Sequence, residues 1–594
     1  MLQEIKKALT LRMNGYAKSP AFPRVRGGLF QFTLEQKLLA ILVIIGSGLR
    51  LYLLADKSIW LDEAFSITIS QHGLFDLLRL VFLTDTHPPL YYLALKIWLL
   101  FGDGETQVRI LSAIFSIAAI PLIYLVAANI FEDERIGLIA ATVLAFSPFQ
   151  VWYAQETRMY AMLTFFVLAS ALFFFRALRY DNLLDWIGYI LATVLALYTD
   201  IGAIWYIVAI SIFFLLSIRR FKERFINWFL CQVAIGILYL PWLPFFVLQT
   251  HRVTAGFWLQ PPSFQTVLGT LLDFHSYNFP FIELSLVYMV MIFVWAYIVP
   301  KRSWQVGLAS LWLFIPLAIS LLFSLRQPIL ISRNLIAASL GYYLLVAGTI
   351  GQFRSSKAVM ALLLPLVAMN LISIGYNFWY EQKEEWRSIA RYVASETENK
   401  PDGLVVFVPG FAELPFHYYF KDYGIPVKTQ GYPGDEIMLH PSPKEVEDLT
   451  ALFEGVPYVW LIMRSTESVS PDWTVKEWLD NNGYVRQKDL IGESLTVLTY
   501  YRWDKAPINV VPNRPGNTSK IFLPLITRNQ EYQTYVVRAG ETLLEIALRF
   551  NTTVQALMDA NHLQNMNEVS EGQELLIPKE DTNDTAPVNS YPYP

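Results

Sequence analysis

Ser58-Ile59-Trp60-Leu61-Asp62-Glu63-Ala64 stands directly after the first strongly apolar segment of the chain, residues 38–54. Two adjacent carboxylates just past a membrane helix are costly to place unless they lie at the interface or in a polar cavity. One interpretation is an interfacial loop whose acids simply face water. The other is a functional site, which is favoured by two further polar stretches, Thr86–Tyr92 and Tyr153–Tyr160.

Composition places the chain in the membrane class. Of its 594 residues, 54% are hydrophobic and only 16% are charged, which is too apolar for a soluble protein of this size. Long apolar runs recur, and each is long enough to span a bilayer. We therefore expect the lipid bilayer, and no nucleic acid, as a partner. The single cysteine, Cys231, lies in an apolar run and excludes an intramolecular disulfide.

Basic residues orient the chain. Residues 1–37 are rich in lysine and arginine, so the positive-inside rule predicts a cytoplasmic N-terminal segment. This segment is too long and too polar for a cleaved signal peptide. Pro88–Phe101 is apolar but about half the usual spanning length, so we expect an interfacial or re-entrant helix there. With that helix not spanning, the later basic clusters all fall on the cytoplasmic side.

The predicted fold begins with a polytopic α-helical membrane domain over residues 38–380. About eleven spans follow from the apolar runs, at residues 38–54, 107–131, 136–150, 159–178, 184–200, 202–218, 226–248, 282–299, 304–324, 334–352 and 358–378. The N-terminus is then inside and the C-terminus outside. The polar loops outside are 55–106, 151–158, 249–281 and 325–333, so all three polar stretches share one face.

Charged residues return after the last span. Residues 381–505 alternate between helical and strand patterns, with helices expected at 384–398, 442–453 and 473–481 and strands at 403–408, 458–463 and 495–501. This alternation predicts a small α/β domain outside the membrane. It carries no phosphate loop or catalytic motif, so we expect a structural cap. Residues 506–533, rich in proline and asparagine, are expected to be a linker.

The C-terminal segment has the pattern strand, helix, helix, strand over residues 534–578. It closely resembles a LysM module, a type of domain that binds N-acetylglucosamine glycans such as peptidoglycan. A degenerate module that serves as a passive cap is the alternative. The last residues, 579–594, have the composition of a disordered tail.

The three polar stretches, taken together and in this order, resemble the polyprenyl-phosphate-sugar-dependent glycosyltransferases of the GT-C fold. The likeness is to the branch with protein O-mannosyltransferases and the lipid A aminoarabinose transferase, over roughly residues 38–390. It implies a hexosyl- or pentosyltransferase at the outer face of the cytoplasmic membrane. The acid that this family uses as general base matches Asp62. Adjacent helical residues diverge by about 100°, so we do not expect Asp62 and Glu63 to contact the same atom. Glu63 could instead position the acceptor or hold a water.

The leaving group implied by the resemblance is a polyprenyl phosphate, which needs positive charge nearby. Arginine suits phosphate because its fork matches the oxygens. Arg158, Arg326 and Arg333 all lie at the predicted outer face, and Arg333 matches a position where the family often carries arginine. An arginine that merely reaches the interface is the alternative. The lysine that some relatives carry near residues 86–89 is absent here.

The remaining candidates for substrate contact lie in the same outer loops. Glu156 could contact a sugar or form a structural pair with Arg158. The other candidates are Tyr153, Gln155, Tyr160, His87 and His275. The two histidines could also ligate a divalent metal, although no third ligand is evident, and phosphate hydrogen bonding or structural roles are alternatives.

Two other functions compete with sugar transfer. A transporter or flippase for lipid-linked glycans predicts polar residues buried in the middle of the helices, and the sequence has few. A non-catalytic wall-binding protein would need only the LysM module, and neither an acidic first loop nor so many helices. The sequence leaves the transferred sugar and the acceptor open, and the acceptor could be a lipid, a protein or a glycan.

Overall fold

The computed structural model describes residues 33–578, apart from 256–260, 299–302, 382, 398–399, 433–448, 465–473, 492–493, 503–519, 523–531 and most of 538–572. The chain forms two compact units. One is Met1–Asp489 with Glu493–Thr518, and the other is Leu490–Gly492 with Ser519–Pro594. Nearly all of the predicted cytoplasmic segment, most of the linker and the whole predicted tail lie outside the described residues.

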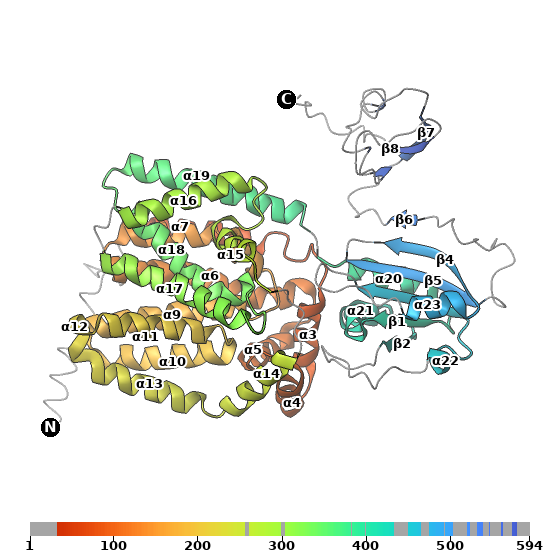
Figure 1. Ribbon diagram of the computed structural model, residues 1–594, viewed down its shortest axis with the longest axis horizontal. Coiled ribbons are helices and arrows are strands. Elements are labelled where there is room, and N and C mark those ends of the chain that lie inside the picture. Colours follow the sequence, from red (N-terminus) through yellow and green to blue (C-terminus); the bar gives the residue numbers. More distant parts are fainter. Residues whose placement is uncertain are drawn as a thin grey trace. The chain divides into compact units, whose positions relative to one another are not determined.

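Long apolar helices build the first part of the larger unit (Figure 1). Each predicted span contains a helix, as expected for apolar segments that must satisfy their own backbone hydrogen bonds in lipid. The helices are α2 (Leu34–Leu51), α6 (Glu105–Phe131), α7 (Glu134–Ala145), α8 (Pro148–Ala154), α9 (Tyr160–Tyr180), α10 (Leu183–Thr199), α11 (Ala203–Leu216), α12 (Ile218–Phe221), α13 (Phe225–Tyr239), α14 (Leu243–Ala255), α16 (Ile282–Ile298), α17 (Ser303–Ser324), α18 (Ile336–Ile350) and α19 (Ser356–Trp379).

Length and apolar composition qualify four helices of the described part as membrane spans, within α6, α9, α17 and α19. Two bent pairs raise the number to six if each pair is one span: α7 with α8, bent by 59°, and α11 with Ile218–Tyr239, bent by 79°. The prediction of eleven spans stays a prediction. The predicted span 226–248 is divided, because Pro241 lies between α13 and α14 and proline lacks the amide that a continuous helix needs.

The first outer loop folds into short helices. They are α3 (Leu61–Gln71), α4 (Leu74–Thr84), α5 (Leu90–Trp98) and the 3₁₀ turn η1 (Leu99–Phe101). The helix predicted at Pro88–Phe101 is present, and it is too short to span. Both acids of the opening stretch lie in the first turn of α3, where carboxylates suit the positive end of the helix dipole.

Two further short elements lie between the membrane helices in sequence. They are α15 (Phe264–Ser276) and the 3₁₀ turn η3 (Ser332–Leu335), which precedes α18.

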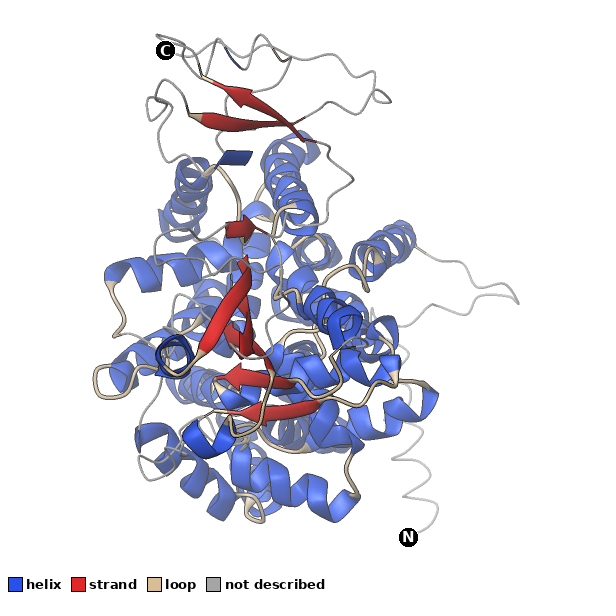
Figure 2. Ribbon diagram, turned by 90° about the vertical axis from the view of Figure 1, so that its right-hand side faces the viewer, coloured by secondary structure: helices blue, strands red, loops and turns tan. Residues whose placement is uncertain are grey.

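A mixed sheet forms the α/β part (Figure 2). Its first five positions run β2-β1-β3-β5-β4, with bounds β1 (Leu404–Val408), β2 (Lys428–Gly431), β3 (Tyr458–Arg464), β4 (Tyr484–Ile491) and β5 (Leu495–Arg502). The central strand β3 is parallel to β1, with Trp460 opposite Val405, and antiparallel to β5, with Trp460 opposite Thr499. The three predicted strands are confirmed, whereas β2 and β4 are strands that the pattern missed.

Helices accompany this sheet. They are α20 (Trp386–Thr397), α21 (Glu413–Phe420), α22 (Leu449–Leu452) and α23 (Thr474–Asn481), with the 3₁₀ turns η4 (Gly410–Ala412) and η5 (Lys421–Tyr423). The helices predicted at 384–398 and 473–481 are confirmed as α20 and α23, and α22 lies within the range of the helix predicted at 442–453. The helix α21 was not predicted from the sequence, and it lies against α3 of the first outer loop.

In the smaller unit, β7 (Tyr532–Val536) pairs antiparallel with β8 (Glu574–Pro578), and Tyr535 stands opposite Leu575. Ile546 and Leu557 pack with these strands in one apolar cluster. The two strands that the LysM pattern predicts are therefore present, and most of the residues of its two helices lie outside the described part. A short strand, β6 (Lys520–Phe522), precedes them.

Candidate active site

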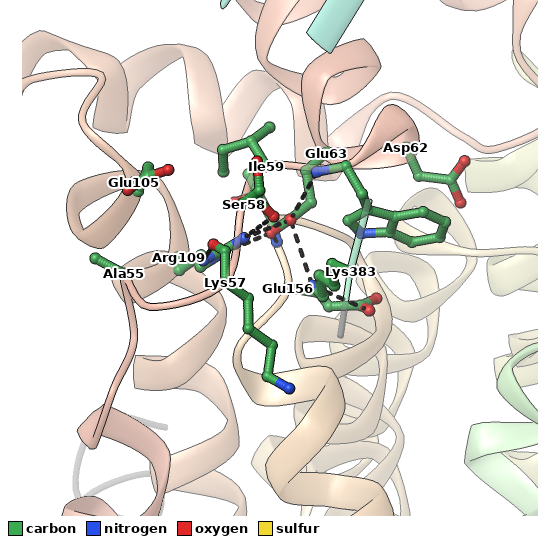
Figure 3. A network of polar contacts seen from close by, with 12 residues as sticks. Ala55, Lys57, Ser58, Ile59, Asp62, Glu63, Glu105, Arg109, Glu156 and Lys383 are labelled. Carbon is green, nitrogen blue, oxygen red and sulfur yellow. Dashed lines mark hydrogen bonds and ion pairs between the residues drawn. The ribbon is translucent and has the colours of Figure 1, made fainter. Parts of the chain in front are cut away.

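The two adjacent acids of α3 point in different directions (Figure 3). The Glu63 side chain is fully buried and receives two hydrogen bonds from Arg109 of α6, Nε to Oε1 at 2.8 Å and Nη2 to Oε2 at 2.7 Å. The backbone N–H of Thr157 donates to the same carboxylate at 2.9 Å. A buried bidentate pair with a further amide donor satisfies a carboxylate almost completely. Glu63 is therefore well suited to joining the first outer loop to α6.

A lysine extends this buried network. Lys383, which follows α19, lies 3.3 Å from Glu63 and 3.3 Å from Glu156 (Figure 3). Burial by itself raises the pKa of Glu63, but Arg109 and Lys383 outweigh it and lower this pKa to about 2. Burial is the main influence on Glu156 and raises its pKa. Lys383 lowers this pKa, and the nearby anionic Glu63 raises it further. The other oxygen of Glu156, Oε2, has no hydrogen-bond partner among the described residues.

Asp62 is the accessible acid of the pair. Its side chain is 27% exposed, and its Oδ2 lies 3.6 Å from Nη1 of Arg333 on η3. Burial raises the pKa of Asp62, but the positive charges of Arg158 and Arg333 outweigh it and lower the pKa below its ordinary value. Asp62 is thus ionised at neutral pH and partly exposed, whereas Glu63 is fully buried and paired with Arg109.

The three candidate arginines have different surroundings. Arg158 is buried, and its Nη1 donates to Ser66 Oγ at 3.0 Å and to the Tyr92 hydroxyl at 3.4 Å. Arg326 is exposed on the turn after α17. Arg333 is partly exposed at 21% and lies beside Asp62. Among these three, Arg333 combines access with proximity to the accessible acid.

Tyr153, Gln155 and Tyr160 flank Glu156 in the sequence. Tyr153 of α8 and Tyr160 of α9 are buried, and their rings meet edge to face at 5.0 Å. The Gln155 amide donates to the carbonyls of Arg50 and Tyr52 at 3.2 and 2.8 Å. Gln155 therefore holds the end of α2, and its predicted contact with substrate stays a prediction.

The two histidines have separate partners. His87 Nδ1 lies 2.9 Å from Asp200 Oδ2, and His275 Nδ1 lies 2.6 Å from the Tyr342 hydroxyl in a buried site. Within the described residues, no group of three or more histidine, cysteine, aspartate or glutamate side chains is placed to hold a metal ion. Their assignment as metal ligands stays a prediction that the geometry does not support further.

Three cations near the site were missed by the sequence analysis: Lys57, Arg109 and Lys383. They line one small pocket together with Leu53, Leu54, Trp152 and Gln155. Lys57 extends away from Glu63 (Figure 3) and donates to the carbonyls of Asn377, at 2.6 Å, and Glu381. Arg109 could have been found, because a charge inside an otherwise apolar span calls for a partner. Lys383 has no such signal, since it follows the last span among other charges.

Family models match two parts of the chain. The model described as dolichyl-phosphate-mannose-protein mannosyltransferase matches residues 86–245, which include His87 and the stretch 153–160 but neither Asp62 nor Arg333. The model of the LysM domain matches residues 535–578. No curated protein is detectably similar in sequence.

Two solved structures are similar in fold to most of this chain. ArnT from Cupriavidus metallidurans in the apo state is 12% identical with a TM-score of 0.54, over 78% of this chain and 97% of ArnT. The same protein bound to undecaprenyl phosphate is 13% identical with a TM-score of 0.51, over the same shares of the two chains. At such identity the likeness defines the fold alone. That fold belongs to the GT-C class of membrane glycosyltransferases, and the predicted resemblance to this class, with a C-terminal LysM domain, is confirmed.

Proposed function

We propose that the protein transfers a hexosyl or pentosyl unit from a polyprenyl-phosphate donor to an acceptor outside the cytoplasmic membrane. The observation that carries the proposal is the open, ionised Asp62 carboxylate beside Arg333 on a GT-C fold. The likeness to a protein solved with undecaprenyl phosphate supports the donor class. The acceptor can be a hydroxyl or an amine on a lipid, a protein or a glycan.

Asp62 is the general base in this proposal. The acceptor oxygen or nitrogen attacks the anomeric carbon, and the bond from that carbon to the phosphate oxygen breaks with its electron pair on the phosphate. The proton of the acceptor passes to Asp62, which must be ionised and within reach to take it. Both conditions agree with the partial exposure of Asp62 and its lowered pKa.

One assay tests the function. The purified protein is incubated with undecaprenyl-phosphate mannose or undecaprenyl-phosphate aminoarabinose and a crude acceptor fraction, and free undecaprenyl phosphate is measured. A transferase releases it in step with the loss of donor. A flippase moves the intact donor across vesicles without releasing it, and a wall-binding protein does neither, so either of those results would replace the proposal.

Arg333 is proposed to contact the donor phosphate. A charge-assisted hydrogen bond contributes about 1.5–3 kcal/mol, so Arg333→Ala should weaken binding of undecaprenyl phosphate about 10- to 100-fold. Arg333→Lys should restore little, because one ammonium does not reproduce the fork. Lipid-induced thermal stabilisation of the purified variants measures this change.

Two controls accompany the Arg333 variants. Arg326→Ala removes an exposed arginine of the same outer region and should leave lipid binding unchanged. Asp62→Asn breaks the ion pair without removing Arg333, so it should still bind the lipid. Native affinity in Arg333→Ala would mean that the phosphate is held elsewhere, with Arg158 as the next candidate.

The LysM domain is proposed to hold the enzyme near peptidoglycan or another N-acetylglucosamine glycan outside the membrane, with the N-terminus in the cytoplasm. Tethering raises local concentration without altering the reaction itself. Deleting residues 530–594 should leave turnover on a lipid acceptor intact and abolish sedimentation with insoluble peptidoglycan.

The orientation has its own test. A C-terminal epitope should be reached by antibody in cells whose outer layer is permeabilised and whose cytoplasmic membrane is intact.

Deleting only residues 579–594 is the matched control, because it removes the tail and spares the matched domain. It should sediment like the full chain. Full sedimentation without residues 530–594 would reject the tether, and loss of turnover would assign the domain to the acceptor site instead. An epitope that is hidden until the inner membrane is lysed would reverse the orientation.

A further inference from the structure

The loop that leads into α3 is held by the α/β part of the same compact unit. Arg387 of α20 donates from Nη2 to the carbonyl of Ala55 at 2.8 Å and from Nη1 to that of Asp56 at 3.3 Å. The backbone N–H of Arg387 donates to Ser58 Oγ at 3.1 Å. These bonds hold residues 55, 56 and 58, which lie just before the helix α3 that carries Asp62.

A tyrosine of α21 holds the next residue. The backbone N–H of Ile59 donates to the Tyr419 hydroxyl at 2.6 Å, and that hydroxyl donates its own proton to Glu105 at the start of α6. Arg387 Nη2 reaches both oxygens of the same Glu105 carboxylate, each at 2.7 Å. The carboxylate therefore joins α20, α21 and α6 at one point, beside the loop that is labelled Ala55 to Ile59 in Figure 3.

Further contacts join the first outer loop to the α/β part. The Tyr418 hydroxyl donates to the Asp103 carbonyl at 2.7 Å, and Lys421 pairs with the Asp103 carboxylate at 2.5 Å. Lys383 reaches Glu63 from the segment that links α19 to α20. A passive cap would need only contacts such as those of Tyr418 and Lys421, whereas Arg387 and Tyr419 bind the loop backbone within seven residues of Asp62.

We infer that α20 and α21 belong to the working active site, and that Tyr419 and Arg387 are positioning residues that set the direction of Asp62. The inference rests on the proposed role of Asp62 as general base. Proton transfer to a side chain depends on its placement, and a misplacement of about 1 Å can cost about 100-fold in rate. A loop anchored from outside the membrane helices supplies that placement.

Tyr419→Phe in the full-length protein tests the inference, because it removes one hydroxyl and keeps the ring. Loss of a hydrogen bond of about 1 kcal/mol or slightly more corresponds to about a tenfold effect. Turnover in the lipid-phosphate assay should fall about tenfold, with the KM for undecaprenyl-phosphate sugar and the apparent melting temperature nearly unchanged. Tyr423→Phe, at an exposed tyrosine of η5, is the matched control and should behave as the native protein.

Two combinations separate positioning from general support. Arg387→Lys should lose turnover like Tyr419→Phe, since one ammonium cannot serve Glu105 and two carbonyls together. In the Asp62→Asn background Tyr419→Phe should add no further loss of residual turnover, because residues that act through one group are not additive. If Tyr419→Phe does not fold, Ser58→Ala removes the loop side of the same contacts and takes its place.

Native turnover in Tyr419→Phe, an equal loss in Tyr423→Phe, or a full additional loss in the Asp62→Asn background would each overturn the inference. The failure of the proposed function has a different signature. If Asp62→Asn is itself fully active, Asp62 is not the base. If Asp62→Asn is inactive while Tyr419→Phe turns over normally, only the positioning role is rejected.

Discussion

Asp62→Asn should lower turnover by about two orders of magnitude or more, because the amide keeps the size of the carboxylate and cannot take the proton of the acceptor. The folded protein should be nearly as stable as the native one. The ion pair between Asp62 and Arg333 is long at 3.6 Å and partly exposed, and pairs of that kind contribute about 0–1 kcal/mol. The measurement is release of undecaprenyl phosphate, with the apparent melting temperature recorded on the same samples.

The pH dependence of turnover is a second test of Asp62 as general base. Arg158 and Arg333 lower the pKa of Asp62 below its ordinary value, against the effect of burial. The general base is therefore ionised above that lowered pKa, and native turnover should lose this contribution only as the pH falls through it. An acid limb near neutral pH, or near-native turnover in Asp62→Asn, would remove Asp62 from the role of base.

Glu63→Gln should differ from Asp62→Asn, because its main effect should be a large loss of stability of the folded protein. Its carboxylate is fully buried against Arg109, and the substitution leaves that guanidinium without its counter-charge. Breaking a buried ion pair from one side costs about 3–5 kcal/mol. The apparent melting temperature of the purified protein should therefore fall well below that of Asp62→Asn, which alters the neighbouring residue.

A matched pair of substitutions isolates the interaction. Arg109→Met alone strands Glu63, with Lys383 left as a partial partner, and should destabilise strongly. Arg109→Met with Glu63→Met removes both buried charges, so it should recover part of the loss. If the double variant is no better than Arg109→Met alone, the pair is not the source of the effect.

Low pH should also destabilise the native protein, because it removes the charge of Glu63. Since the folded pKa of Glu63 is about 2 and lies below its ordinary value, its contribution is present above that ordinary value and is lost as the pH falls toward 2. Glu63→Gln lacks this component, so the stability of the variant should depend less on pH between about 5 and 2. Parallel acid curves for the two proteins would contradict the assignment.

Much of the fold follows from local pattern. The helices occupy the predicted spans because apolar length is a property of each segment alone, and lipid leaves such a segment little choice but a helix. Strands β1, β3 and β5 were predicted because buried strands are short apolar runs between turn residues. Strand β4 carries the mixed sequence YVRQKDLI, which alternates weakly, and the short β2, KTQG, is mostly polar, so neither stood out.

The candidate site was only partly accessible to the same reasoning. The sequence by itself determined a membrane protein, predicted that its three polar stretches share one face, and singled out Asp62, Glu63 and three arginines. It could not say which acid is free, because two adjacent carboxylates are chemically alike and helix geometry requires only that they diverge. The tertiary structure decided this by bringing Arg109 from 46 residues away, and Lys383 from 320 residues away, onto Glu63 and not onto Asp62. Pairing over such separations depends on how the helices pack, which is why Asp62 is left open beside Arg333.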